Sequence, residues 1–124
     1  MTMKTKLTLA LVLTAFASAA GAVGTKVDTK LGSVIANADG MTLYTFDKDE
    51  GGVSACYGGC AKSWPPFIAK EGAAPEGDFG LTTRDDGAQQ WTWKGQPLYL
   101  WVNDRKPGDV TGDGVGGTWH AAVE

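Results

Sequence analysis

The chain has 124 residues, a length typical of one domain, and its apolar share of 43% and charged share of 20% are those of an ordinary globular protein. Its formal net charge is −3, and it contains no run of lysine or arginine. Because phosphate backbones and anionic lipids are bound by basic patches, this charge balance argues against nucleic acid and anionic membrane as partners.

The first 22 residues are predicted to be a secretory signal peptide. Lys4 and Lys6 precede an uncharged apolar run over residues 7–16, and small residues follow, so cleavage is expected after Ala19 or Ala22. The run is shorter than the about 20 apolar residues of a membrane span, which makes an uncleaved anchor the less favoured alternative. Cleavage after Ala22 leaves 124 − 22 = 102 residues with 11 − 2 = 9 basic and 14 acidic side chains, a net charge of −5. We expect an exported protein, periplasmic or secreted, with no stable membrane insertion after cleavage.

Residues 23–124 are predicted to form a single all-β domain with at most one or two short helical turns, because strand-like runs alternate with glycine-rich turns. The expected strands, in chain order, lie at 33–37, 41–46, 64–69, 79–83, 89–93, 96–101 and 119–123. Turns at Asp39-Gly40 and Lys94-Gly95 make a hairpin of the first two strands and another of the strands at 89–93 and 96–101. Alternation along a strand predicts Tyr44 on one face and Leu43 on the other.

A sequence repeat is the strongest feature of this region. The stretch LYTFDKD from Leu43 returns as LYLWVND from Leu98, and Tyr44 and Tyr99 are separated by 99 − 44 = 55 residues. The same offset matches Gly32 with Gly87, Gly40 with Gly95, Phe46 with Trp101, Asp49 with Asp104 and Trp64 with Trp119. We therefore predict two tandem units of a hairpin plus a strand, at 31–69 and 86–124, with a linker at 70–80. Two copies are too few for a solenoid and should pack on each other with pseudo-twofold symmetry.

The repeated Tyr-x-aromatic-x-x-Asp signature resembles that of a family of bacterial secreted repeats of unknown function, predicted lipoproteins with a Yx(F/W/Y)xxD motif. The stretches CYGGCAKSWPP and GDVTGDGVGGTWH also resemble that family, so the likeness extends over nearly all of residues 23–124. The chain departs from the family in having no cysteine near the predicted cleavage site, which favours a free form over a lipid-anchored one. The resemblance implies export and a repeat architecture, and it implies no catalytic residue.

The tyrosine and aspartate of each copy, Tyr44 with Asp49 and Tyr99 with Asp104, could together offer a polar surface to a ligand. The alternative is structural, because a buried phenol needs a hydrogen-bond partner and an aspartate after a strand caps the amides of a turn. We favour the structural interpretation, since a folding device is copied with its unit whereas a catalytic site seldom is.

Cys56 and Cys60 are the only two cysteines. In an oxidising compartment an even pair in a small domain is most simply a disulfide, here closing a loop of five residues. The alternative is a periplasmic copper or thiol redox site, in which His120, the only histidine, would complete a soft Cu(I) site with both cysteines. We favour the disulfide and expect no metal and no cofactor. The Asp109–Gly114 stretch has the first half of an EF-hand loop but lacks its final glutamate, so an EF-hand is rejected.

Five tryptophans are many for this length. Trp64 and Trp119 recur with the repeat, which favours a place in the core. Trp91 and Trp93 do not recur, and they share one face of a strand, so they are a possible ligand surface for a sugar or a peptide. The sequence shows no catalytic constellation. It predicts a non-enzymatic binding or envelope-associated protein whose ligand or envelope partner is unknown, with the copper or thiol redox protein as the alternative.

Overall fold

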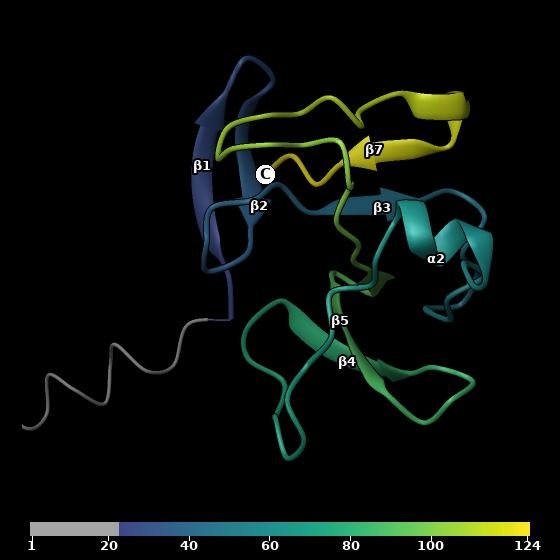
Figure 1. The fold of residues 1–124 in the computed structure, drawn as a ribbon. Helices are drawn as coiled ribbons and strands as arrows, with labels where there is room; N and C mark the ends of the chain where they lie inside the picture. The colour runs from purple at the N-terminus through teal and green to yellow at the C-terminus, as the bar shows by residue number, and fades with distance from the viewer. Residues whose placement is uncertain (1–22) are drawn as a thin grey trace, which may run out of the picture.

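Short antiparallel strands joined by turns and loops form the framework of residues 23–124, the part of the chain that the computed structural model describes (Figure 1). The elements in chain order are β1 Thr25–Thr29, β2 Gly32–Ala36, β3 Tyr44–Phe46, α2 Gly59–Ser63, β4 Phe79–Thr83, β5 Gln89–Trp93, β6 Gln96–Pro97, η2 Val115–Gly117 and β7 Trp119–Ala121. The predicted all-β architecture with one or two short helical turns is confirmed. The predicted signal peptide lies outside the described residues, and among those described no helix has the length and apolarity to span a membrane.

Three small antiparallel sheets organise these strands. β1 pairs with β2, β3 pairs with β7, and β4, β5 and β6 form a three-stranded sheet in that order. In Figure 1 the β4–β5 hairpin lies apart from the β1–β2 hairpin, and β3 and β7 run beside each other. β4 covers the predicted short strand at 79–83, so the segment expected as a linker, 70–80, ends inside this strand.

The first predicted hairpin is present, and its first strand also pairs with a strand that sequence reasoning missed. The Asn37 amide donates to the Met41 carbonyl and the Leu43 amide donates to the Ile35 carbonyl, both at 3.0 Å, on either side of the Ala36–Thr42 bridge. The side-chain oxygen of Asn37 accepts from the amides of Asp39 and Met41, which holds the loop between the two runs. β2 also pairs along its whole length with β1. The second predicted hairpin, with its turn at Lys94-Gly95, is present as β5 and β6.

The two copies pair with each other around their shared tyrosines. The amide of Tyr44 donates to the Tyr99 carbonyl at 2.8 Å, and the amide of Tyr99 donates to the Tyr44 carbonyl at 2.9 Å. The strand that ends each copy crosses to the other copy, since Ala121 pairs with Tyr44 and Pro66 bridges to Tyr99. These two pairs are equivalent under the offset of the repeat. Tyr44 corresponds to Tyr99, since 99 − 44 = 55, and Pro66 corresponds to Ala121, since 121 − 66 = 55. The copies are therefore interlocked about a pseudo-twofold axis, as the repeat predicted.

The offset of 55 does not hold along the whole repeat. Leu43 donates its amide to the Ile35 carbonyl, and Leu98 donates its amide to the Trp91 carbonyl. The two leucines differ by 98 − 43 = 55 but their acceptors differ by 91 − 35 = 56. The first strand of each predicted hairpin is thus shifted by one position between the copies.

This shift arises in the preceding turn. In the first copy Thr29 pairs directly with Gly32, whereas in the second copy the Arg84 amide donates to the Ala88 carbonyl around a turn one residue longer. Gly32 therefore corresponds in space to Ala88, and its sequence match with Gly87 is corrected. Both glycines have positive φ, 102° and 90°, so each serves its own turn.

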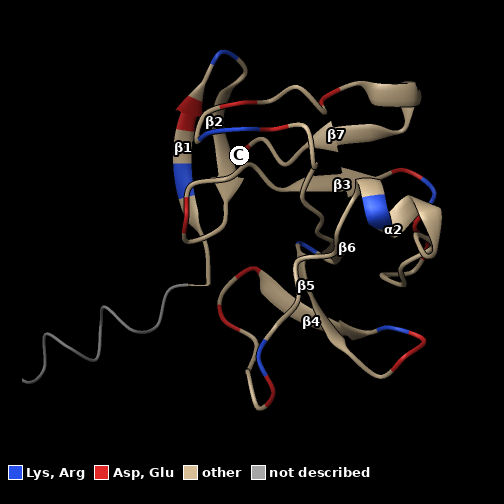
Figure 2. Ribbon diagram, in the orientation of Figure 1, with Lys and Arg blue, Asp and Glu red and all other residues tan. Residues whose placement is uncertain are grey.

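The buried side chains of residues 23–124 include two apolar clusters, one on each face of the central strands. Tyr44 and Tyr99 belong to the cluster that also holds Trp64 and Trp119. Leu43 and Leu98 belong to the other cluster. The predicted alternation of faces is therefore confirmed. Figure 2 shows acidic and basic positions interspersed, mostly in the loops and turns of the described part of the chain.

Candidate functional site

The aromatic residues of the repeat motif form one continuous stack in the first cluster. Trp64 and Trp119 lie face to face at the centre, with ring centroids 3.9 Å apart and an interplanar angle of 1°. Phe46 stacks on the outer face of Trp119 at 4.0 Å, and Trp101 stacks on that of Trp64 at 4.1 Å. The stack contains two residues from each copy, so it is the packing between the repeats. Aromatic pairs of this kind contribute about 0.5–1.5 kcal/mol each beyond the area they bury.

The tyrosines of the motif bind the aspartates of the opposite copy. The Tyr44 hydroxyl donates to Asp104 Oδ2 at 2.6 Å, and the Tyr99 hydroxyl donates to Asp49 Oδ2 at 2.7 Å. The expected grouping of Tyr44 with Asp49, and of Tyr99 with Asp104, is therefore corrected. Both tyrosines are fully shielded from solvent. Their phenols thus hold the two copies together and are not available to a ligand.

The same aspartates cap loop amides, as the sequence predicted. Asp49 Oδ1 accepts from the Ala55 amide at 2.7 Å, and Asp104 Oδ1 accepts from both the amide and the hydroxyl of Thr111. Burial raises the pKa of the Asp49 carboxyl, and its hydrogen bonds with Tyr99 and Ala55 lower it only in part. Burial and the bond to Asp104 also raise the pKa of Tyr44, which keeps the phenol protonated.

A buried arginine beside this network was missed by sequence reasoning. Arg84 is 6% exposed, and its guanidinium donates to Ser54 Oγ at 3.1 Å, Gln90 Oε1 at 2.8 Å and the Cys56 carbonyl at 2.9 Å. It also lies over the ring of Tyr57, 4.4 Å from the centroid. In the sequence Arg84 stands beside two aspartates in a polar turn, where nothing distinguishes it from a solvated charge. These bonds tie the β4–β5 hairpin to the loop that carries the cysteines.

Cys56 and Cys60 form a disulfide, as predicted. His120 lies on β7 and contacts Asp47 Oδ2 through Nε2 at 2.9 Å, with both side chains about half exposed. Within residues 23–124 no three His, Cys, Asp or Glu side chains are grouped so as to hold a metal ion. In the described part of the chain, His120 therefore lies beside an acidic residue and does not form a metal site with the two cysteines.

The glycine-rich Asp109–Gly114 loop packs against the aromatic stack. A Cβ placed on Gly112 would lie 2.8 Å from Trp64 and 3.0 Å from Trp101, so this position has no room for a side chain. Asp109 Oδ2 accepts from the amides of Arg105 and Lys106, and these bonds lower the pKa of its carboxyl. Asp109 thus organises its own turn. Gly112 serves packing, whereas Gly114 has open space around its Cβ position and a positive φ of 87°, so it serves the backbone of the loop.

The two tryptophans that do not recur have different surroundings. Trp91 is 7% exposed and belongs to the second cluster, where Phe79 meets it edge to face at 6.4 Å. Trp93, two residues later at the end of β5, is only partly buried and lines a cavity. The expected ligand surface of two tryptophan rings therefore contains only Trp93, because the core covers Trp91.

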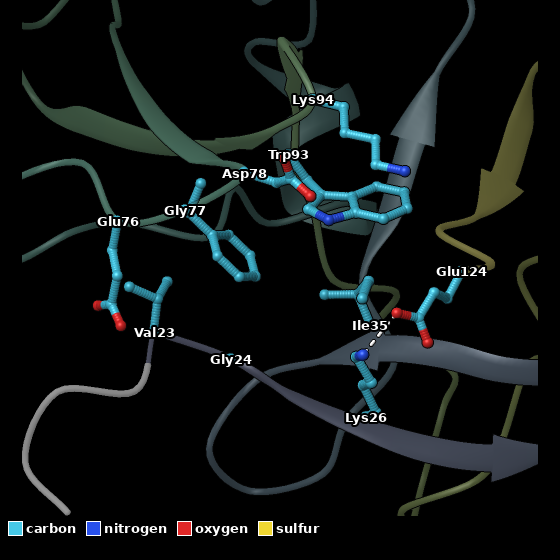
Figure 3. A pocket seen from close by; sticks show the side chains of 11 residues that line it. Val23, Gly24, Lys26, Ile35, Glu76, Gly77, Asp78, Trp93, Lys94 and Glu124 are labelled. Atoms are coloured by element: carbon cyan, nitrogen blue, oxygen red, sulfur yellow. Dashed lines mark ion pairs between the residues drawn. The ribbon is translucent and has the colours of Figure 1, made fainter. Parts of the chain in front are cut away.

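The cavity beside Trp93 has a volume of about 310 Å³ and opens between the β1–β2 and β4–β5 hairpins. Trp93, Phe79 and Ile35 provide its apolar walls. Figure 3 shows charged side chains around them, with Lys94 on one side of the Trp93 ring and the Lys26–Glu124 ion pair on the other. The remaining lining residues are Val23, Gly24, Glu76, Gly77 and Asp78.

The walls of this cavity use positions at which the copies differ. Phe79 pairs with Trp93 at the open end of the β4–β5 hairpin. In the β1–β2 hairpin the corresponding positions, one step beyond the Thr25–Ala36 pair, are Gly24 and Asn37. A Cβ at Gly24 would lie 3.1 Å from the Phe79 ring, so the small residue of one copy makes room for the aromatic residue of the other.

Lys94, at the rim, has a conformation unusual for its residue type. Within residues 23–124 it is the one non-glycine residue with a positive φ, 52°, and with Gly95 at 84° it forms the two-residue turn between β5 and β6. Such turns favour asparagine or glycine at this position, and another side chain there costs about 1 kcal/mol. The Lys94 ammonium lies 4.7 Å from the Trp93 ring centroid, a cation–π contact that offsets part of this cost.

A family model described as a secreted repeat of unknown function matches residues 25–68 and again residues 80–123. The first match begins at β1, the strand that sequence reasoning left outside the repeat. Comparison with the curated proteins and with the solved structures found no match. The two matches cover most of the chain and agree with the interlocked copies seen in the fold. The chain therefore belongs to the family of secreted repeats of unknown function and carries two copies of that repeat.

Proposed function

We propose that this protein is a non-enzymatic binding module of the bacterial cell envelope, exported in free form, and that it holds a small ligand in the cavity beside Trp93. The observation that carries the proposal is that the residues common to both copies bond to one another, whereas residues that differ between the copies line the cavity. The motif residues Tyr44, Tyr99, Asp49 and Asp104 are occupied with one another, which leaves no free polar group at the motif.

The cavity has the features of a ligand site. Its volume of about 310 Å³ lies at the lower end of the range of about 300–1,000 Å³ found for small-molecule pockets. Aromatic and aliphatic side chains form its walls and charged groups surround its opening, a combination that gives both binding energy and orientation. The unusual backbone of Lys94 supports the same assignment, because strained residues gather at functional sites.

The proposal predicts where small molecules will bind. Protein recovered after export is labelled with ¹⁵N and mixed with a fragment set that contains neutral sugars, amides, aromatic amines and carboxylic acids. We expect shifts at the Trp93 indole and at the amides of Lys26 and Phe79, lost in Trp93→Ala and retained in Val53→Ala, which changes an exposed residue outside the cavity. Mass spectrometry should recover the bound fragment unchanged. Shifts centred elsewhere, or conversion of the fragment, contradict the proposal.

A further inference from the structure

We propose that the cavity takes a neutral saccharide, with one sugar ring lying against Trp93 and its hydroxyl groups bonded to the surrounding charged side chains. This inference rests on the proposed function and specifies its ligand. It is drawn from the charge, the apolar surface and the size of the cavity.

The charges around the cavity disfavour an ionic ligand. The lining contains two basic side chains and three acidic ones, a formal charge of 2 − 3 = −1. The basic residues are Lys26 and Lys94, and the acidic residues are Glu76, Asp78 and Glu124. Lys26 and Glu124 already form an ion pair with each other. A strongly anionic or cationic ligand would meet like charges on at least one side, and such contacts lower affinity.

The same groups disfavour a purely apolar ligand. Neither Glu76 nor Asp78 belongs to an ion pair within residues 23–124, so both carboxylates keep acceptor sites for a ligand. An apolar molecule would strip water from these groups without replacing its hydrogen bonds, which is costly. Hydroxyl groups replace them, since each can donate to a carboxylate and accept from the Lys94 ammonium.

The apolar part of the cavity matches the C–H face of a sugar ring. Trp93 offers an indole surface, and Figure 3 shows Lys94 above this ring and Ile35 below it, beside the cavity. An indole gives a large and rigid apolar surface at low entropic cost, which suits a flat ring whose polar groups point outward. With about 310 Å³ available, the site holds one or two sugar rings and not a long glycan.

The test titrates the exported protein with named probes and follows the tryptophan indole signals by ¹H–¹⁵N NMR. The saccharide probes are cellobiose and N,N′-diacetylchitobiose, which distinguish plain hexose from N-acetylhexosamine. The other probes are indole-3-propionamide, which is aromatic and neutral, and glucuronic acid and glucosamine, which carry charge. The signal of Trp93 is identified by its loss in Trp93→Phe.

We expect at least one disaccharide to shift the Trp93 signal in a saturable way and to bind more tightly than the charged sugars. Trp93→Ala should raise its Kd at least about tenfold, whereas Trp93→Phe, which keeps an aromatic ring, should raise it less. Glu76→Gln with Asp78→Asn should also weaken binding, and it leaves the apolar walls intact if the alanine variant fails to fold.

Two results overturn the inference in distinguishable ways. If indole-3-propionamide or a charged probe shifts the Trp93 signal and neither disaccharide does, the saccharide assignment is wrong and the proposed binding function stands. If no probe of any class shifts that signal, both fail. Disaccharide binding that is unchanged by Trp93→Ala also removes this cavity as the sugar site.

Discussion

Each buried tyrosine of the repeat motif donates to an aspartate that lies in the other copy. The Tyr44–Asp104 and Tyr99–Asp49 bonds, at 2.6 and 2.7 Å, are the two halves of one symmetric device. A charge-assisted hydrogen bond of this kind contributes about 1.5–3 kcal/mol when both partners are present. The pairing between copies therefore gives these residues an energetic role that is independent of any ligand.

A double-mutant cycle tests this pairing. Tyr44→Phe and Asp104→Asn should interact by about 0.5–3 kcal/mol in the free energy of unfolding, because each removes one partner of the same bond. Tyr44→Phe and Asp49→Asn should be additive within about 0.5 kcal/mol, because these residues share no direct bond. Chemical denaturation of the wild type, the three single variants and the two double variants gives both numbers. A larger coupling for Tyr44 with Asp49 would mean that the motif pairs within its own copy.

The raised pKa of the Asp49 carboxyl predicts how the free energy of unfolding depends on pH. Burial raises its pKa in the folded protein, so in the window between the unfolded and folded pKa values the native state binds more protons. The contribution of Asp49 to stability therefore rises as the pH falls through this window. We expect the stability advantage of the wild type over Asp49→Asn to grow from pH 7 toward pH 4. An advantage that shrinks on acidification would show that the folded-state pKa is depressed.

Sequence reasoning predicted which residues belong to this device but not how they pair. A tyrosine bonded within its copy and one bonded across copies have the same local sequence, so the offset alone contains no information about the partner. Arg84 shows a second limit, since its burial depends on Ser54, Gln90 and a carbonyl that come from separate segments.

At the level of elements, hairpins were predicted well where the turn chemistry was local. The Lys94-Gly95 turn sets the β5–β6 pairing, and the Asn37 side chain holds the loop from which the chain returns to pair with β2. β1 was missed because its sequence, TKVDT, is mostly polar and its side chains are largely exposed. Trp91 and Trp93 share a face of β5, but Trp91 is buried in the second cluster and Trp93, at the end of the strand, is only partly buried.

The Cys56–Cys60 disulfide closes a small loop that leads into α2. For a loop of five residues the chain-entropy model gives about 2 kcal/mol of stabilisation, so reduction should lower the free energy of unfolding by about that amount without unfolding the domain. Denaturation with and without reductant measures the difference.

Intact mass, thiol labelling and metal analysis of the exported protein decide between this disulfide and the copper or thiol redox alternative. We expect no free thiol, a gain of two hydrogens on reduction and no stoichiometric copper. A reduced pair that binds one Cu(I), lost in Cys60→Ser, would establish the alternative and displace the structural assignment of the cysteines.

At the scale of the molecule, the two repeats are parts of one core. Trp64 and Trp119 stack on each other from different copies, and each copy completes its pairing with the last strand of the other. A repeat alone would therefore expose the faces of its tryptophan that stack on the other copy, and its tyrosine and aspartate would lose the hydrogen bonds that they make to the other copy. The cavity beside Trp93 depends on the same interlocking, because its opposite walls come from the β1–β2 and β4–β5 hairpins.

The most direct test of this account divides the chain between Ala74 and Pro75, in the segment that joins the copies. Fragments 23–74 and 75–124 are prepared separately and then mixed, and folding is followed by ¹H–¹⁵N NMR. We predict that each fragment alone is unfolded and that the mixture gives a dispersed spectrum at a 1:1 ratio, with the Trp64 and Trp119 signals of the intact protein. If either fragment folds alone as a stable monomer, the copies are independent units and the interlocked core is wrong.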